Sequence, residues 1–152
     1  MRQKVAALVF SASALVGLAL HEGFRGKAYD DGVGVQTIGF GTTEGVERGD
    51  TITVERALVR LADGVEVRER QLRACIGDVL MHQHEWDAIV SWAYNVGTSA
   101  ACSSTLVRKL KAGDYPGACA ELLRWTKAGG RELRGLVTRR QAEYRTCMGE
   151  AR

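Results

Sequence analysis

HEGFRGKAYDDGVGVQTIGFGTT, residues 21–43, sets the architecture of this chain. Glu22 lies at the start of the stretch, just after a long apolar run, and the chain then passes through an Asp-Asp-Gly turn at residues 30–32. Residues 33–40 then place alternate side chains on opposite sides, which between glycine-rich turns is typical of a small β-hairpin or meander. The sequence therefore predicts a carboxylate at a helix end (Glu22), a second carboxylate on a turn (Asp31) and a hydroxyl a few residues later (Thr37).

Two carboxylates in one site can divide acid–base work between them. One stays protonated and acts as a general acid, while the other stays ionised. Glycoside hydrolysis needs such a pair, because one group protonates the leaving oxygen and the other directs water or attacks carbon. Glu22 follows apolar residues, as suits the acid, and Asp31 lies in a polar turn that suits an ionised group. The pair alone does not exclude an ordinary surface glutamate followed by an unrelated Asp-Gly turn.

The spacing of these residues resembles that of the phage-type lysozymes, the T4 lysozyme-like muramidases. Their pattern has Glu-Gly near the end of the first helix, a Tyr-x-Asp turn and a T-[IV]-G-[FYV]-G-x-T segment, which residues 37–43 match as TIGFGTT. Downstream matches are WAYNVG at 92–97, SSTL at 103–106, AGDY at 112–115, Trp125 and GLVTRR at 135–140. The resemblance spans about residues 10–150, and implies that Glu22 is the general acid while Asp31 and Thr37 hold the attacking water.

The resemblance also implies a fold and a substrate. The expected fold is α+β and mainly helical, with a small β-hairpin lobe and a helical lobe joined by a long helix, and a cleft between the lobes. The expected reaction is inverting hydrolysis of the β-1,4 bond between N-acetylmuramic acid and N-acetylglucosamine in peptidoglycan, for host-cell lysis by a phage. No metal or cofactor is implied, and we expect a monomer. In the family an arginine approaches the catalytic glutamate. Arg140 is aligned with it and Arg139 is the alternative, while Asn95 matches an Asn-x-Gly that shapes the cleft or touches substrate. The resemblance thus makes Asn95 and Arg140 the expected substrate-binding residues.

Composition is compatible with this reading. The chain has 152 residues, a formal charge of +3 and a pI of about 8.8. Mild basicity suits an anionic polymer such as a bacterial wall and is no evidence of nucleic-acid binding. Two rivals stay open: a lytic transglycosylase, which closes a 1,6-anhydro ring, and a non-catalytic protein that binds the wall or disrupts membranes. Intact Glu22, Asp31 and Thr37 argue against both.

Residues 1–20 form a weakly apolar N-terminal segment. Arg2 and Lys4 precede sixteen uncharged residues, of which five are Ala, two Ser and one Gly, whereas a membrane-spanning helix needs about 20 apolar residues. We favour a signal-anchor that inserts in the inner membrane and is later released to the host periplasm, because weak hydrophobicity is what release requires. The alternatives are a core helix over residues 11–22 in a protein that stays cytoplasmic before lysis, and a signal peptide cleaved near residues 12–14.

The remaining sequence has helical periodicity, so strands are expected only within residues 21–52. Thr53 is the expected N-cap of a long helix over residues 53–74, whose charged residues should form a solvated face: Arg56, Arg60, Glu66, Arg68, Glu69 and Arg70. Shorter helices are expected around 86–93, at 105–110, at 115–126 and around 137–148, with Trp86 and Trp92 in the core. The predicted organisation is an N-terminal segment (1–20), a catalytic β-containing lobe (21–52), and the linking helix with the helical lobe (53–152).

Four cysteines show neither metal-finger spacing nor a nucleophile motif. An even number in a chain that reaches the periplasm predicts two disulfides, with three possible pairings. We favour Cys75–Cys102 and Cys119–Cys147, each of which closes a moderate loop and adds about 3 kcal/mol on the chain-entropy model. Four reduced, buried thiols in a cytoplasmic protein are the alternative.

His82-x-His84, with Glu85 beside it, raises the question of a metal site. On a helix these two imidazoles would point to nearly opposite sides. Neither Cys-x2-Cys nor His-Glu-x-x-His accompanies them. The sequence therefore disfavours a zinc amidase or peptidase.

Overall fold

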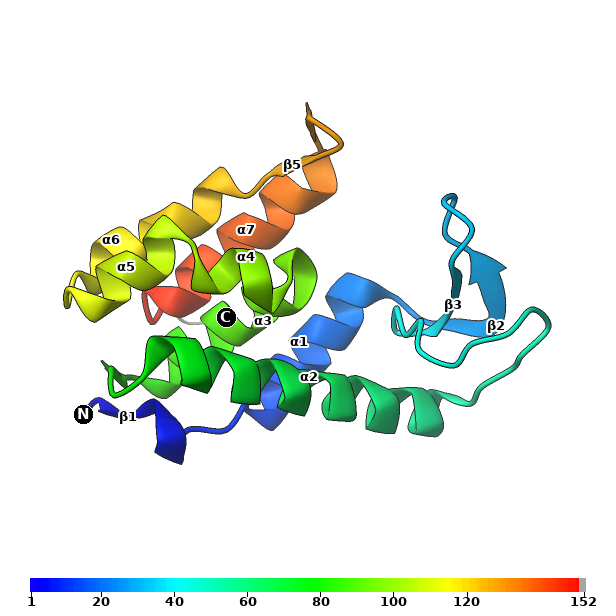
Figure 1. Ribbon diagram of the computed structural model, residues 1–152, viewed down its shortest axis with the longest axis horizontal. Coiled ribbons are helices and arrows are strands. Elements are labelled where there is room, and N and C mark those ends of the chain that lie inside the picture. Colours follow the sequence, from blue (N-terminus) through cyan, green and yellow to red (C-terminus); the bar gives the residue numbers. More distant parts are fainter. Residues whose placement is uncertain (151–152) are drawn as a thin grey trace. The chain divides into compact units, whose positions relative to one another are not determined.

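The computed structural model describes residues 1–150. These residues are mainly helical, with three short antiparallel two-stranded sheets (Figure 1), so the predicted mainly helical α+β class is confirmed. The elements in chain order are β1 (Gln3–Lys4), η1 (Val5–Ala7), α1 (Ala12–Glu22), β2 (Arg25–Asp30), β3 (Gln36–Gly39), α2 (Val54–Ile76), β4 (Leu80–Met81), α3 (Gln83–Val96), α4 (Thr98–Cys102), α5 (Thr105–Lys111), α6 (Tyr115–Glu121), η2 (Leu122–Arg124), β5 (Lys127–Ala128), β6 (Arg131–Glu132) and α7 (Arg134–Cys147).

The chain forms two compact units. Residues 15–66 make up one, here called the hairpin unit, and residues 1–14 with residues 67–150 make up the other, the helical unit. Helices α1 and α2 each have residues in both units.

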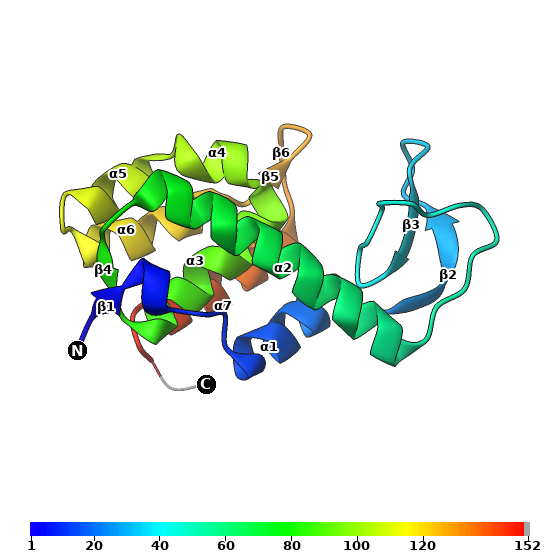
Figure 2. The ribbon, with the colours of Figure 1, turned by 60° about the horizontal axis from the view of Figure 1, so that its bottom comes forward.

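The hairpin unit is built on the antiparallel pair β2–β3, whose strands run side by side (Figure 2). Tyr29 pairs with Thr37, and the register is irregular between Arg25 and Tyr29. Residues 36–40 alternate as the sequence predicts only in part, because Thr37, Ile38, Gly39 and Phe40 are all buried. Gly39, at the end of β3, lies against Ala57 of α2. This packing accounts for the burial on both sides of β3.

Helix α2 begins where the sequence predicts, directly after Thr53, and ends at Ile76, two residues beyond the predicted end. The backbone N–H of Arg56 donates to Oγ1 of Thr53 at 3.3 Å, which is the expected N-cap. Its apolar stripe is buried at Ala57, Leu61, Val65, Leu72 and Ile76. Glu69 is also buried, so the prediction that all the charged residues of this helix are solvated is wrong.

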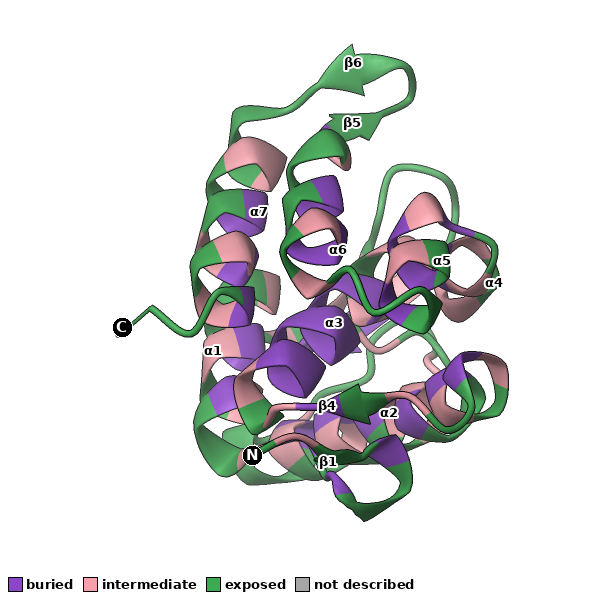
Figure 3. Cartoon of the chain, turned by 90° about the vertical axis from the view of Figure 1, so that its left-hand side faces the viewer, coloured by how far each residue is buried: buried purple, intermediate pink, exposed green. Residues whose placement is uncertain are grey.

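Helix α3 is the centre of the helical unit. Figure 3 shows it buried over most of its length, and residues 85–93 are all buried. Trp86 and Trp92 are fully buried, as predicted. Two disulfides brace the unit with the favoured pairing, Cys75–Cys102 between α2 and α4 and Cys119–Cys147 between α6 and α7.

Strands also occur outside residues 21–52, contrary to expectation. In the helical unit β1 pairs with β4 and β5 pairs with β6. Gly129-Gly130 joins β5 to β6 as a two-residue hairpin turn, for which Gly-Gly is a favoured sequence. These ladders are only two residues long, too short to leave an alternation of apolar and polar residues in the sequence.

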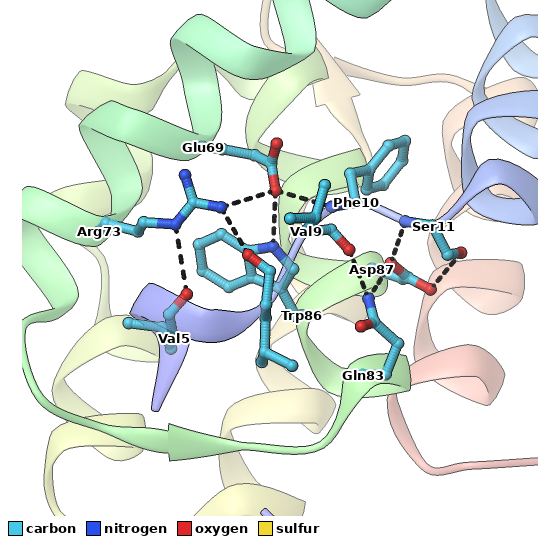
Figure 4. A network of polar contacts seen from close by, with 10 residues as sticks. Val5, Val9, Phe10, Ser11, Glu69, Arg73, Gln83, Trp86 and Asp87 are labelled. Atoms are coloured by element: carbon cyan, nitrogen blue, oxygen red, sulfur yellow. Dashed lines mark hydrogen bonds and ion pairs between the residues drawn. The ribbon is translucent and has the colours of Figure 1, made fainter. Parts of the chain in front are cut away.

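The N-terminal segment is divided between the two units, because residues 1–14 belong to the helical unit and residues 15–20 to the hairpin unit. Residues 5–20 do not form one helix: η1 covers Val5–Ala7 and α1 begins at Ala12. Val5, Leu8 and Phe10 are buried. Side chains of α2 and α3 bind the segment's backbone, as Figure 4 shows. Within residues 1–150, no helix combines the length and apolar character needed to cross a membrane.

The two histidines at 82 and 84 lie differently from the prediction. Their rings stack, with centroids 5.1 Å apart and planes at 22°. His82 precedes α3 as its N-cap in an extended conformation. Helical spacing therefore does not apply to the pair, and the expectation of opposite directions is wrong.

Candidate active site

Glu22 is the last residue of α1, and its side chain is partly exposed. The helix ends there because Gly23 follows, and the backbone N–H of Gly23 donates to the carbonyl oxygen of Ala19 at 2.9 Å. The carboxylate therefore belongs to a rigid helix end, as the sequence predicts.

The loop between β2 and β3 holds Asp31. Its Oδ1 accepts backbone N–H groups from Val33 at 3.0 Å and Val35 at 3.1 Å. Asp30 binds the same loop in the same way, through the N–H groups of Gly32 at 2.8 Å and Gly34 at 3.1 Å. Both aspartates are exposed, and among the described residues Oδ2 of Asp31 accepts no hydrogen bond. One oxygen of Asp31 thus fixes the loop, and the other is left without a hydrogen bond from the described residues.

Thr37 lies on β3, two residues after this loop. Its side chain is buried, and Oγ1 donates to the carbonyl oxygen of Val35 at 3.4 Å. That carbonyl belongs to the same residue whose N–H binds Asp31. The loop therefore links Asp31 and Thr37 through Val35.

A tight turn after β3 explains the glycines of TIGFGTT. Ile38 and Thr42 exchange two backbone hydrogen bonds, of 2.9 and 3.0 Å. Both glycines between them are left-handed, Gly39 with φ 64° and Gly41 with φ 82°. A Cβ on Gly39 would lie 2.9 Å from Cβ of Ala57 in α2. A Cβ on Gly41 would lie 3.2 Å from Oε2 of Glu22, so the backbone of this turn lies against the carboxylate.

The hairpin unit thus holds all three residues predicted to be catalytic, Glu22, Asp31 and Thr37. Gly41 also lies at this site and was not among the residues predicted from the sequence. The repeated glycine of the TIGFGTT segment was the available signal, because a tight left-handed turn favours a residue without Cβ.

The two residues predicted to bind substrate lie in the helical unit and contact each other. Nη2 of Arg140 donates to Oδ1 of Asn95. Arg140 is only 1% exposed, and its Nε donates to the carbonyl oxygen of Trp125 at 2.9 Å. Trp125 packs edge-on against Trp92, with ring centroids 5.3 Å apart. Asn95 itself is exposed, so Arg140 is a buried support for an exposed amide.

Glu143 is the counter-ion of the buried arginine pair. Its Oε2 accepts from Nη1 of Arg140 at 2.6 Å, and its Oε1 accepts from Nε of Arg139 at 3.1 Å. Oγ of Ser91 donates to the same Oε1 at 2.9 Å. Helical spacing places Glu143 three and four residues after the two arginines, which allows one carboxylate to serve both.

The chain is similar to several known proteins. Residues 19–143 match the family model described as Phage lysozyme. The endolysin of Acyrthosiphon pisum secondary endosymbiont phage 1 is 42% identical over 137 residues, which cover 88% of this chain and 93% of that protein. The SAR-endolysin of Bacteriophage PS119 is 39% identical over 128 residues, covering 84% and 76%. The solved endolysin from Escherichia coli O157:H7 phage FAHEc1 superposes with a TM-score of 0.84 at 31% identity, over 93% of this chain and 94% of that one.

Proposed function

This chain belongs to the phage lysozyme family, whose members act on peptidoglycan in lysis by phage, and from that premise we propose a specific reaction. The protein hydrolyses the β-1,4 bond between N-acetylmuramic acid and N-acetylglucosamine. The observation that carries the proposal is the hairpin unit itself. It fixes Glu22 at a helix end against the turn at Gly41, and it also holds the Asp31 loop and Thr37.

Each residue has a role in the proposed reaction. Glu22 donates its proton to the glycosidic oxygen as the bond from that oxygen to the anomeric carbon breaks. Water adds to the anomeric carbon from the opposite face, and Asp31 takes the proton that the water loses. Thr37, linked to Asp31 through Val35, helps to hold that water. The product is then inverted at the anomeric carbon.

We assign a substrate-binding role to Asn95, with Arg140 as its support. Asn95 is exposed, while Arg140 is buried and donates to its amide oxygen. A fixed amide presents one donor group to a sugar hydroxyl or acetamido carbonyl without first losing rotamer freedom. An Arg140→Lys variant should therefore raise KM for peptidoglycan fragments more than it lowers kcat.

The Glu22→Gln variant tests the catalytic assignment. It keeps the shape of the side chain but removes the acid, so the rate of wall lysis should fall by about 10²-fold or more. Unfolding of the variant should match that of wild type. Glu44→Gln, on an exposed glutamate of the same unit, is the matched control and should lyse walls normally. Lysis by Glu22→Gln within a few-fold of wild type would refute the assignment and favour a non-catalytic protein.

We further propose that residues 5–20 insert weakly in the inner membrane and are then released, so that the enzyme becomes active in the host periplasm. A similar protein is named SAR-endolysin. The folded structure can accommodate the released segment, because the side chains of Glu69, Arg73, Gln83 and Asp87, on α2 and α3, bind the backbone of residues 5–11. The helical unit can therefore form these contacts only after the segment has left the membrane.

Three alanines of this segment allow a clean test. Ala6, Ala7 and Ala12 are exposed in the folded protein, so leucine at all three leaves the core unchanged. Each leucine strengthens membrane insertion by a few tenths of a kcal/mol, and the triple variant should stay longer in the membrane fraction and delay lysis. The control places leucine at three other exposed alanines, at positions 74, 112 and 120. Equal fractionation of the two triple variants would contradict the release route.

A further inference from the structure

We propose that Gly41 is a positioning residue for the acid carboxylate, an inference that rests on the proposed function of Glu22. The absence of a side chain at this position sets where Oε2 of Glu22 lies. A Cβ built on Gly41 would come within 3.2 Å of that oxygen, and this oxygen is the only atom it would meet within 4 Å among the described residues. That separation is tighter than nine in ten Cβ contacts in proteins, so the carboxylate would have to move by a few tenths of an ångström.

The turn that carries Gly41 cannot give way easily. Its two ends, Ile38 and Thr42, are joined by a pair of backbone hydrogen bonds. Its first glycine, Gly39, lies so close to α2 that an added Cβ would meet Cβ of Ala57 at 2.9 Å. Ile38 and Phe40 are buried. The turn is therefore fixed on its α2 side, and Glu22 is the partner that can move.

Movement of Glu22 matters because proton transfer is sensitive to geometry. A misplacement of about 1 Å can cost roughly 10²-fold in rate. Alanine at position 41 needs the carboxylate to shift by a few tenths of an ångström, and a larger side chain needs more. Peptidoglycan binding does not depend on that shift, so the effect should fall on kcat and leave KM nearly unchanged.

Gly45 is a matched control within the same unit. It is also left-handed, with φ 66°, but a Cβ there would meet nothing within 4 Å. Gly41→Ala and Gly45→Ala therefore impose similar backbone strain, and only the first imposes a contact on Glu22. Asparagine tolerates the left-handed region better than alanine does, so Gly41→Asn and Gly45→Asn form a second pair that keeps the comparison if the alanine variant folds poorly.

Steady-state hydrolysis of solubilised peptidoglycan strands decides the matter. We expect Gly41→Ala to lower kcat by about tenfold, and Gly41→Asn by more, with KM within about twofold of wild type. The two Gly45 variants should keep the wild-type kcat. In a Glu22→Gln background, Gly41→Ala should have no further effect, because no acid is left to misplace.

Two results would overturn the inference alone. Equal kcat for the Gly41 and Gly45 variants would show that the contact with Glu22 does not control the rate. A rise in KM with unchanged kcat would show that a side chain at position 41 only obstructs substrate. A fully active Glu22→Gln variant would instead overturn the proposed function and this inference with it, and the two failures are distinguished because they occur in different variants.

Discussion

Glu69 ties the N-terminal segment to the helical unit, and its removal should destabilise the protein by a predictable amount. One oxygen, Oε1, accepts from the backbone N–H of Phe10 at 2.7 Å, from Nε1 of Trp86 at 2.9 Å and from Nη2 of Arg73 at 3.1 Å (Figure 4). The side chain is only 5% exposed. Water therefore does not replace the carboxylate when it is removed.

The cost follows from the donors that lose their acceptor. A buried donor left unsatisfied costs about 1–3 kcal/mol, and Glu69→Ala leaves two such donors, on Phe10 and Trp86. Arg73 loses less, because it also donates to the carbonyl oxygens of Val5 and Leu8. We expect the free energy of unfolding to fall by about 3–5 kcal/mol, the usual cost of removing one member of a buried pair. For a chain of this size the melting temperature should fall by about 10 °C.

Guanidinium unfolding with the disulfides intact measures this loss. Asp63→Ala is the control, since Asp63 is an exposed carboxylate on the same helix, and it should change stability by less than about 0.5 kcal/mol. Glu69→Gln keeps one acceptor oxygen and should fall between the two. If Glu69→Ala were as stable as Asp63→Ala, the N-terminal segment would not be held by this carboxylate.

Other predictions concern catalysis and acid stability. Asp31→Asn should be severely impaired in lysis. Asp30→Asn is the control, because Asp30 makes equivalent hydrogen bonds in the same loop, and it should lyse walls at near the wild-type rate. Equal loss of activity in both variants would assign Asp31 a purely structural role. Thr37→Ala should be partly impaired, and NMR of the nascent product should show the α anomer first, since β first would contradict inversion. Lys109 donates to Glu121 at 2.8 Å and holds the pKa of that carboxyl below its ordinary value of 4.5. The contribution of this pair to the free energy of unfolding is therefore complete above about pH 4.5 and is lost as pH falls through the lower folded-state pKa. The stability difference between wild type and Glu121→Gln should shrink over that range in urea unfolding, and a constant difference would contradict it.

Local signals in the sequence were sufficient where the structure is local. Thr53 marks the start of α2 because an N-cap acts within one turn, and the observed bond is to Arg56. The disulfide pairing was also predicted correctly. Glu69 was misjudged because its partners Phe10 and Trp86 are 59 and 17 residues away. Nothing in the helical pattern distinguishes it from a solvated glutamate.

The candidate site shows the same contrast between local features, which could be predicted, and contacts between distant residues, which could not. The types and spacing of Glu22, Asp31 and Thr37 could be read from the sequence by resemblance to the family. The repeated glycine of TIGFGTT signals a left-handed turn, but it does not show that the turn lies against Glu22. That contact depends on a turn closed by Ile38 and Thr42 and packed on α2. The burial of Arg140 could not be predicted from the sequence either. Its counter-ion Glu143 lies on the same helix, and two arginines followed by a glutamate form a charge pattern that is common on exposed helix faces.

Mass spectrometry of the fragments that the purified protein releases from peptidoglycan identifies the bond that is cleaved and the product that forms. The proposed hydrolysis yields disaccharide-peptide fragments with a hydrated, reducing N-acetylmuramic acid end. Fragments lighter by one water, with a 1,6-anhydro end, would show a lytic transglycosylase instead. Reducing N-acetylglucosamine ends, cleaved peptides with intact glycan strands, or no cleavage at all would refute the proposed reaction.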